Sequence, residues 1–336
     1  MIEKLWDNPE IYQIFIPMPE NPLKNLNCYV IREGQECLII DTGFNRSECA
    51  EALKAGLAEL QIRPEQTRLF ITHMHSDHCG LANEFAAKGI PIYMSGIDHD
   101  YLRRTMNGNN WPALEAFFLR EGFPESEMAL QVSGNQARRY APNTLFPINR
   151  VADGDKLTLG PWTFVCIHTP GHTPGHMCLY FEEQLILFSG DHVLFDITPN
   201  ISVFNEVFHS LADYLGSLNR LKLLNIVQTF PAHRKWLGNT HERIDNIIEH
   251  HRNRLQEILQ AVEKNPGIGA YDIASHITWS SRGKPWSDFS PNQRWFAVGE
   301  TLSHLVWLLD SEYTTVDSKR KYFLGENALC KKAISF

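Results

Sequence analysis

Short apolar runs that end in histidine or aspartate recur along the first two thirds of this 336-residue chain. The most informative segment is 72–78, Thr-His-Met-His-Ser-Asp-His, which places four potential metal ligands directly after an apolar run. In extended backbone, alternate side chains point to the same side, so His73 and His75 can bind one ion. Asp77 and His78 lie where the chain turns into a helix, and they are free to face a second ion. One short segment can therefore serve two adjacent metals.

Other candidate ligands follow apolar runs in the same way. Asp41 comes after 38–40, His172 after 164–167, Asp191 after 185–188 and His233 after 226–230. In α/β proteins, ligand sites gather beyond the carboxyl ends of the strands, so we expect these side chains to converge. Imidazole and carboxylate donors suit Zn²⁺, and they also suit iron or manganese.

Each of these residues has an ordinary explanation when it is taken alone. A histidine is more often a surface or packed residue than a ligand, and an aspartate after a strand commonly caps a helix. The ordered set favours a metal site, because packing and helix capping do not explain why such residues recur at the same point of successive apolar runs. His176 and His192 lie beside ligands in the sequence, and we expect them to support the ligands rather than bind metal.

The apolar periodicity predicts an α/β fold in which strands alternate with helices. Strands are expected at 11–17, 27–31, 36–40, 68–72, 91–94, 156–159, 162–169, 177–181, 185–189 and 226–230. Helices are expected at 50–60, 81–88, 98–106, 112–121 and 211–223. From about residue 243 the pattern becomes helical over 243–264, 271–278 and 292–309, followed by β-prone runs at 313–316 and 321–324. That order of three helices and a hairpin is typical of a winged-helix module.

These patterns, together with the length, predict two domains. Residues 1–240 are expected to form a catalytic domain, in which 97–150 is a helical insertion that covers the site as a lid. Residues 241–336 are expected to form a small, mainly helical, winged-helix-like C-terminal domain.

The ordered series of motifs resembles the metallo-β-lactamase superfamily over residues 12–240. The resemblance implies an αββα sandwich with a dinuclear site between its sheets. It also implies a ligand set: His73, His75 and His172 for the first metal, Asp77, His78 and His233 for the second, Asp191 bridging both, and Asp41 orienting the cluster from outside. With its helical tail, the chain resembles the group that includes the lactamase-β-like 2 and glyoxalase II-like proteins. The sequence Pro-Ala-His-Arg-Lys at 231–235 departs from glyoxalase II itself, which has an acidic–aromatic pair after the last histidine.

Such a site favours hydrolysis. A metal ion lowers the pKa of bound water from about 15.7 to about 7, so hydroxide is available at neutral pH. We therefore expect a dinuclear metal-dependent hydrolase, with two divalent ions, Zn²⁺ first among them. A metal-bridging hydroxide would attack a small acyl-type substrate (a thioester, lactone or ester), and Asp77 would orient that hydroxide as the catalytic carboxylate.

The charge distribution bears on a nucleic-acid alternative, a phosphodiesterase or endoribonuclease. The formal charge is −8, and residues 241–336 carry 12 basic and 12 acidic side chains, so the excess of acid lies in 1–240. An acidic surface repels a phosphate backbone. In the tail, the helix expected at 292–309 has Arg294 as its only lysine or arginine. We expect the tail to pack or to form a homodimer rather than to bind nucleic acid.

A further alternative is an iron-dependent redox enzyme, because related sites hold iron. Nothing in the sequence marks a flavin or rubredoxin module, and the seven cysteines are scattered with no C-x-x-C pair. That cysteine usage favours reduced thiols in a cytoplasmic protein. No apolar run approaches the ~18–20 residues of a membrane-spanning helix, and the start has no secretory pattern, so we expect no membrane partner.

Candidate substrate contacts lie in the insertion. Arg103 and Arg104 could bind an anionic small-molecule substrate, as could the pair at 138–139, whereas Trp111 and Phe118 could line a pocket for an apolar acyl group. The alternatives are solvated ion pairs for the arginines and packing for the aromatic rings.

Overall fold

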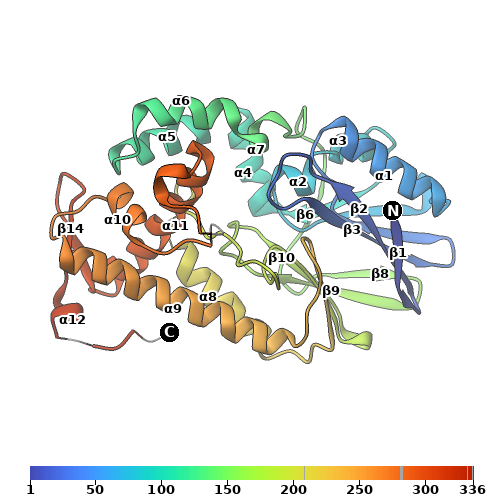
Figure 1. The fold of residues 1–336 in the computed structure, drawn as a ribbon. Coiled ribbons are helices and arrows are strands. Elements are labelled where there is room, and N and C mark those ends of the chain that lie inside the picture. Colours follow the sequence, from blue (N-terminus) through green and yellow to red (C-terminus); the bar gives the residue numbers. More distant parts are fainter. Residues whose placement is uncertain (208, 281–282, 331, 335) are drawn as a thin grey trace. The chain divides into compact units, whose positions relative to one another are not determined.

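The computed structural model describes residues 1–336 apart from 208, 281–282, 331 and 335 (Figure 1). The chain divides into two compact units. The first comprises Met1–Asn107, Gln136–Pro199 and Arg220–Arg243, and the second comprises Gly108–Asn135, Asn200–Asn219 and Ile244–Phe336. The expected insertion at 97–150 is thus divided between the two units, since its central residues 108–135 belong to the second unit and the rest belong to the first.

The first unit contains a seven-stranded sheet whose strands follow one another in chain order. They are β1 (Ile2–Asp7), β2 (Glu10–Pro17), β3 (Asn25–Glu33), β4 (Glu36–Ile40), β5 (Thr67–Ile71), β6 (Ile92–Ser95) and β7 (Asn149–Val151). The strands from β1 to β4 pair antiparallel, whereas β4, β5, β6 and β7 pair parallel. The carboxyl ends of these four strands therefore share one edge of the sheet.

A second, five-stranded sheet in the same unit has the order β12-β11-β10-β9-β8. Its strands are β8 (Lys156–Leu159), β9 (Trp162–His168), β10 (Met177–Phe181), β11 (Ile186–Gly190) and β12 (Gln228–Pro231). Only the β11–β12 pair is parallel, so both strands deliver their carboxyl ends to the same place.

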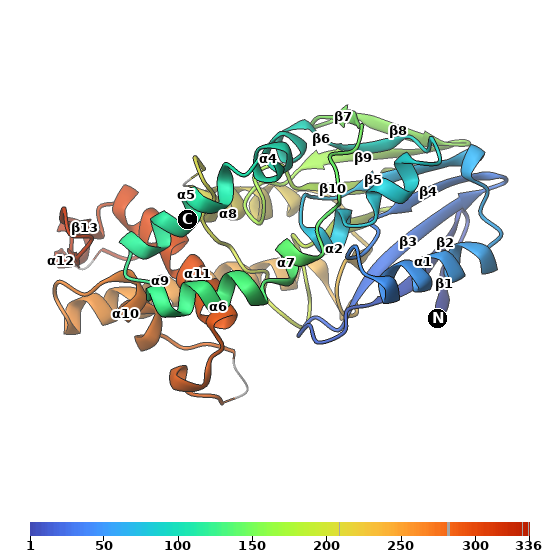
Figure 2. The same cartoon turned by 90° about the horizontal axis from the view of Figure 1, so that it is seen from above.

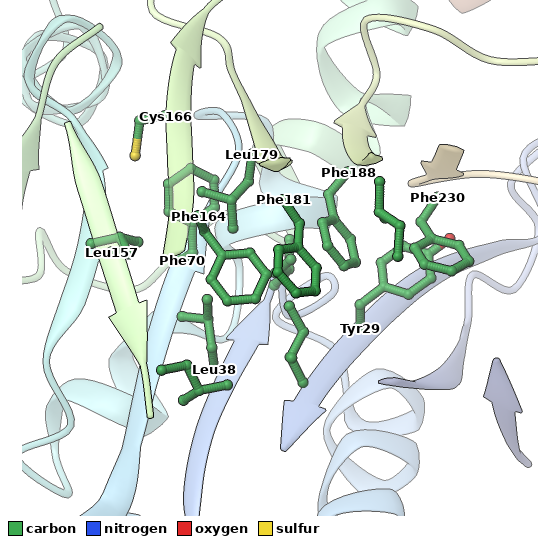
Figure 3. Packing of buried hydrophobic residues seen from close by; sticks show 14 of the residues in the cluster. Tyr29, Leu38, Phe70, Leu157, Phe164, Cys166, Leu179, Phe181, Phe188 and Phe230 are labelled. Atoms are coloured by element: carbon green, nitrogen blue, oxygen red, sulfur yellow. The ribbon is translucent and has the colours of Figure 1, made fainter. Parts of the chain in front are cut away.

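The core of the first unit is a cluster of buried side chains contributed by both sheets (Figure 3). Tyr29 of the first sheet meets Phe188 of the second edge to face, with ring centroids 5.5 Å apart. Phe164 and Phe181 pack within the second sheet at 4.6 Å. Fully burying an aromatic side chain of this size stabilises the fold by about 1.5–3 kcal/mol, so the cluster holds the two sheets together.

Helices of the first unit pack against its first sheet. They are α1 (Ser47–Glu59), α2 (Ser76–Cys79), α3 (Ala82–Ala86), α4 (Gly96–Met106) and α7 (Gln136–Arg139). Helix α1 lies beside β2 in both ribbon views (Figures 1 and 2), and a Cβ on its Gly56 would stand 2.7 Å from the Ile14 side chain. The small residue is what lets this helix approach the strand so closely. The unit has the αββα sandwich fold that the family resemblance implied.

The second unit is mainly helical. It includes α5 (Asn110–Arg120), α6 (Glu125–Gly134), α10 (Ala270–His276), α11 (Pro291–Asp310), α12 (Glu326–Leu329) and most of α8 (Ser210–Leu221) and α9 (Thr240–Lys264). Strands β13 (Thr314–Val316) and β14 (Tyr322–Leu324) form a hairpin. Helix α11 begins with a capping box in which Ser290 and Gln293 satisfy each other's backbone N–H groups.

Most of the expected elements are confirmed, including the three C-terminal helices and the hairpin in their expected order. The winged-helix comparison itself stays a prediction. Strands β1 and β7 and helices α6, α7 and α12 were not expected, and the helix expected at 81–88 is confirmed as the shorter α3, at 82–86. The four-residue helix α2 precedes α3, and a Cβ on Gly80, between the two helices, would lie 2.5 Å from the Ser76 carbonyl oxygen. None of the helices that the structure describes is long and apolar enough to cross a membrane.

Candidate metal centre

Strand ends and one short helix of the first unit bring the seven predicted ligands together. His73 and His75 follow β5, Asp77 and His78 lie in α2, His172 follows β9, Asp191 follows β11 and His233 follows β12. All of them are buried except His75, which is half-buried. Their donor atoms form two main groups, described below, and a third group of His73, His78 and Asp191 that links them; the atoms within each group lie within 4.8 Å of one another.

The first group is His73, His75 and His172. The Nδ1 atom of His75 lies 3.0 Å from His73 Nε2 and 3.0 Å from His172 Nε2. One nitrogen carries at most one hydrogen, so it cannot satisfy both neighbours by donating. Zn–N bonds of about 2.0–2.1 Å would put the donors of a tetrahedral site about 3.3 Å apart. The three nitrogens therefore fit a shared cation.

The second group is Asp77, His78 and His233. The Nε2 atom of His233 lies 3.3 Å from Asp77 Oδ2, and His78 Nε2 lies 3.9 Å from the same oxygen. Two imidazoles and a carboxylate at these separations again fit a divalent ion.

Asp191 lies between the two groups. Its Oδ2 is 3.5 Å from His172 Nε2 of the first group. Its Oδ1 is 3.6 Å from His78 Nε2 and 3.4 Å from His233 Nε2 of the second group. One carboxylate thus presents an oxygen to each side, which is the arrangement that a bridging ligand needs.

Hydrogen bonds to the Nδ1 atoms of three histidines orient their rings so that the Nε2 atoms face the centre of the site. His78 Nδ1–H donates to Asp41 Oδ2 at 2.7 Å, and His233 Nδ1–H donates to the Asn25 carbonyl at 2.8 Å. The Thr72 hydroxyl donates to Asp41 at 2.8 Å, so its oxygen is left to accept from His73 Nδ1–H at 3.0 Å. Each of these imidazoles consequently turns its Nε2 toward the centre.

Three buried side-chain atoms that face the centre of the site have no hydrogen-bond partner among the described residues: His78 Nε2, His233 Nε2 and Asp191 Oδ1. A buried polar atom without a partner is costly, so a native site with three of them together indicates a missing ligand. These orphaned atoms, the spacing of the donors and the donor types all fit two divalent metal ions.

The electrostatics of the two groups differ. Burial and the neighbouring histidines lower the pKa of His73 well below its ordinary value, and that of His75 to about 3. Burial also opposes protonation of His78, but the carboxylates of Asp41, Asp77 and Asp191 outweigh it and raise its pKa well above the ordinary value. His73 and His75 are therefore neutral at pH 7, whereas the surrounding carboxylates favour a positive charge at His78.

The residues expected to support the ligands are placed next to them. His176 Nε2 accepts the Asp191 backbone N–H at 3.2 Å, and its Nδ1 lies 2.8 Å from the Thr169 hydroxyl. The ring of His192 packs 5.8 Å from that of His176, and neither residue belongs to a donor group. Asp41 accepts from His78 and from both the backbone and the hydroxyl of Thr72.

Sequence reasoning missed three residues that hold the ligand segments. Thr72 directly precedes the motif, and its hydroxyl could have been noticed there. Asn27 donates through its amide to the carbonyls of Pro231 and Arg234, on either side of His233. Asp98, at the start of α4, bonds to two ligand-bearing segments. Neither Asn27 nor Asp98 has a motif of its own, and only the fold brings them to the site.

The candidate substrate residues are not part of the donor groups. Arg103 bonds to Asp100 at 2.9 Å on the surface of α4, and the Arg104 guanidinium lies 5.4 Å from the ring centroid of Tyr101. Trp111 and Phe118 belong to the second unit. Phe118 is fully buried and stacks on Trp295 with a centroid distance of 3.7 Å, which favours the packing role over a substrate contact.

A buried two-group histidine–aspartate centre at the strand ends of an αββα sandwich defines a class of metal-dependent enzymes. Comparison with known families places the chain within it: residues 22–233 match the Metallo-beta-lactamase superfamily. The chain belongs to this superfamily, whose members are typically hydrolases and commonly bind two divalent metal ions.

Individual relatives extend beyond that region. The chain is 28% identical over 271 residues to a Beta-lactamase-like protein 2 homolog of Caenorhabditis elegans, covering 79% of this chain and 74% of the relative. It is 24% identical over 241 residues to an Atrochrysone carboxyl ACP thioesterase of Aspergillus fumigatus, covering 72% of this chain and 61% of the relative. Among solved structures, a metallo-beta-lactamase family protein from Thermus thermophilus is 26% identical, with a TM-score of 0.78 over 94% of this chain and 98% of that one.

Proposed function

We propose that this chain is a dinuclear metal-dependent hydrolase that cleaves a small acyl-type substrate: a thioester, lactone or ester. The observation that carries the proposal is the position of Asp191, whose two oxygens lie 3.4–3.6 Å from the imidazole nitrogens of two separate donor groups. When bound, two divalent ions would supply a water-derived nucleophile at neutral pH and would polarise the acyl carbonyl.

In this proposal His73, His75 and His172 hold one ion, and Asp77, His78 and His233 hold the other. Zn²⁺ is the expected ion because its usual ligands are imidazole and carboxylate, although iron and manganese take the same donors. Asp41 and His176 support the ligands, one by orienting His78 and the other by accepting the Asp191 backbone N–H.

Asp77 is proposed as the catalytic carboxylate. Burial favours its neutral form, but the neighbouring His78 and His233 outweigh burial and lower the pKa of Asp77 to about 2. The group is therefore ionised throughout the neutral range, where it can accept a hydrogen bond from the attacking water and hold it in place.

The choice of an acyl substrate is supported by the thioesterase among the relatives and by the charge of the chain. A nucleic-acid substrate is less well supported, because Arg294, the only lysine or arginine of α11, is committed elsewhere. Its guanidinium pairs with Glu127 and donates to the Ser287 carbonyl at 2.9 Å. A helix without free cations offers little to a phosphate backbone.

The test is hydrolysis of thioester, lactone, ester, phosphodiester and RNA substrates by the metal-loaded chain. We expect acyl hydrolysis that is lost on exhaustive chelation and restored by Zn²⁺. Asp77→Asn should lower turnover by about 10²-fold or more, because the neutral amide holds the attacking water and the second ion less well than the carboxylate does. The control is Asp272→Asn, which changes an exposed aspartate of α10 and should leave turnover unchanged. Acyl hydrolysis that survives chelation, or an unimpaired Asp77→Asn enzyme, would refute the proposal.

A further inference from the structure

Asp98 is a buried carboxylate that lies outside the donor groups. It belongs to the first turn of α4, whose N-terminus is capped by the Ser95 side chain accepting the Ile97 N–H at 3.2 Å. The side chain is 0% exposed. A charged group this deep in a fold normally has a specific set of partners.

Three donors from two segments converge on this carboxylate. The Met74 backbone N–H donates to Oδ2 at 2.9 Å. The Thr173 hydroxyl donates to the same oxygen at 2.6 Å, and the Gly175 backbone N–H donates to Oδ1 at 2.6 Å. Asp98 thus bonds on one side to the β5–α2 loop and on the other to the β9–β10 loop.

The positions of these donors relative to the ligands are informative. Met74 lies between His73 and His75, and Thr173 directly follows His172. The two segments that Asp98 joins are therefore the two that carry the whole first group.

Close packing fixes the second segment against α4. A Cβ at Gly175 would lie 2.6 Å from the Asp98 backbone nitrogen and 2.8 Å from Asp98 Oδ1. No other residue fits there without displacing the loop. The approach of this loop to the helix is therefore set by the glycine and the carboxylate together.

The last ligand of the second group is held by different residues. Its loop is bonded to strand β3, where Asn27 N–H donates to the Ala232 carbonyl at 2.7 Å and the Asn27 amide donates to Arg234 O at 2.7 Å. The hydrogen bonds of Asp98 reach the segments of the first group, and those of Asn27 reach the loop of His233. The loops that carry His172 and His233 therefore have separate supports.

We propose that Asp98 is a positioning residue that sets the spacing of His73, His75 and His172 and so determines how tightly the first metal ion is bound. The proposal rests on the proposed function, because it assumes that the first group holds a metal. It assigns to Asp98 no contact with metal or substrate.

Asp98→Asn keeps the size of the side chain but not its chemistry. An amide has one acceptor oxygen and one donor nitrogen, whereas the two carboxylate oxygens here face three donors. Whichever way the amide turns, its NH₂ group faces either Gly175 N–H or Met74 N–H. The backbone N–H left facing a donor must move away, and the loop that carries a ligand moves with it.

The experiment measures Zn²⁺ stoichiometry and the two stepwise affinities by competition with a chromophoric chelator. The chains compared are wild type, Asp98→Asn and Asp100→Asn. The Asp100 variant is the matched control, because it changes the same residue type two positions along α4, where the side chain pairs with Arg150 at the surface. Supports of metal ligands typically contribute 10–100-fold to affinity. We expect Asp98→Asn to weaken one Zn²⁺ site by that factor, leave the other within about twofold, and leave the control unchanged.

If Asp98→Asn does not fold, Thr173→Val is measured in its place by the same chelator competition. It removes only the hydroxyl donor, keeps the shape of the side chain, and should weaken the same site by a smaller factor. Two sites of unchanged affinity in the variant that folds, or an equal loss at both, would overturn the positioning role. A wild-type chain that binds fewer than two ions would instead contradict the proposed function, so the two failures are distinguishable.

Discussion

At the residue scale, the centre depends on which nitrogen of each histidine carries the proton. Asp41, the Asn25 carbonyl and Thr72 each accept an Nδ1–H, and this leaves the Nε2 atoms of His78, His233 and His73 to converge. Asp41 itself has a φ of +60°, a backbone conformation that costs an ordinary residue of the order of 1–3 kcal/mol. The hydrogen bonds that it accepts from Thr72 and His78 are what hold it there.

Asn27 gives a prediction at this scale. Its amide is the donor to the loop that carries His233, and Asn27→Ala removes both side-chain bonds to that loop. We expect a 10–100-fold loss of Zn²⁺ affinity at the second group and little change at the first, because Asn27 bonds to the loop of His233, whereas Asp98 bonds to the segments of the first group. Stepwise chelator competition measures it. A uniform loss of affinity at both sites would contradict the separation.

The candidate ligands and the neighbouring Asp41, His176 and His192 could be picked out from the sequence, but Asn27 and Asp98 could not. His73 to His78 are close together in the chain, and the others stand at the same point of each apolar run, so a pattern reveals them. Asn27 is 204 residues away from Pro231 in sequence, and Asp98 is 75 residues from Thr173. Such partners are joined only by the folded sheets, and no local spacing encodes them.

At the scale of elements, the parallel strands explain why one centre forms. Strands β4 and β5 of the first sheet and β11 and β12 of the second are parallel pairs, and each of these four strands ends in a ligand or in Asp41. Periodicity predicted these strands well because they are short, apolar and followed by polar residues. It missed β1, whose residues are half-buried or exposed, because such a strand lacks a continuous apolar face.

Helix α5 gives a prediction at the element scale. Phe118 is fully buried between Trp295, at 3.7 Å, and Phe123, at 6.2 Å between ring centroids. Phe118→Ala should lower the free energy of unfolding by about 3–5 kcal/mol, because it removes a packed ring and leaves a cavity. Chemical denaturation measures the loss. A variant of unchanged stability whose KM for the acyl substrate rises would instead assign the ring to substrate binding.

At the scale of the whole molecule, the second unit contains a buried polar cluster of its own. His304 Nδ1–H donates to the Glu300 carbonyl at 2.7 Å, so its Nε2 accepts from His251 Nδ1–H at 3.0 Å. Both imidazoles are neutral in this arrangement. Burial lowers the pKa of His251 well below its ordinary value, and it lowers the pKa of His304 to about 4, against the opposing effect of Glu300.

This cluster predicts loss of stability in acid. Below about pH 6.5 the unfolded chain binds a proton on each histidine that the folded chain excludes, so stability falls as the pH drops from about 6.5 toward 4. Each such histidine contributes up to about 1.4 kcal/mol per pH unit to the slope. His304→Gln should therefore flatten the dependence of unfolding free energy on pH by up to that amount. Contributions from the metal centre cancel in the comparison, and parallel curves for the two proteins would contradict the expectation.

The second compact unit draws on three separate parts of the chain, an arrangement that local patterns do not indicate. The residues that join the second unit from the middle of the chain, 108–135 and 200–219, are separated in sequence from the C-terminal helices that they accompany. Glu121 shows why this was not visible: it is fully buried, and it pairs with Arg320 and accepts from the Tyr322 hydroxyl at 3.0 Å, about 200 residues along the chain. A long-range ion pair of this kind has no signature in local periodicity.

The most direct test of the dinuclear centre is the metal content of the purified chain and of two ligand variants. We predict two divalent ions per chain in the wild type. His172→Ala, which removes a ligand of the first group, and His233→Ala, which removes one of the second, should each retain one ion and lose acyl hydrolysis. A wild-type chain that binds one ion or none after loading with Zn²⁺, or variants that both keep the wild-type metal content, would contradict the account.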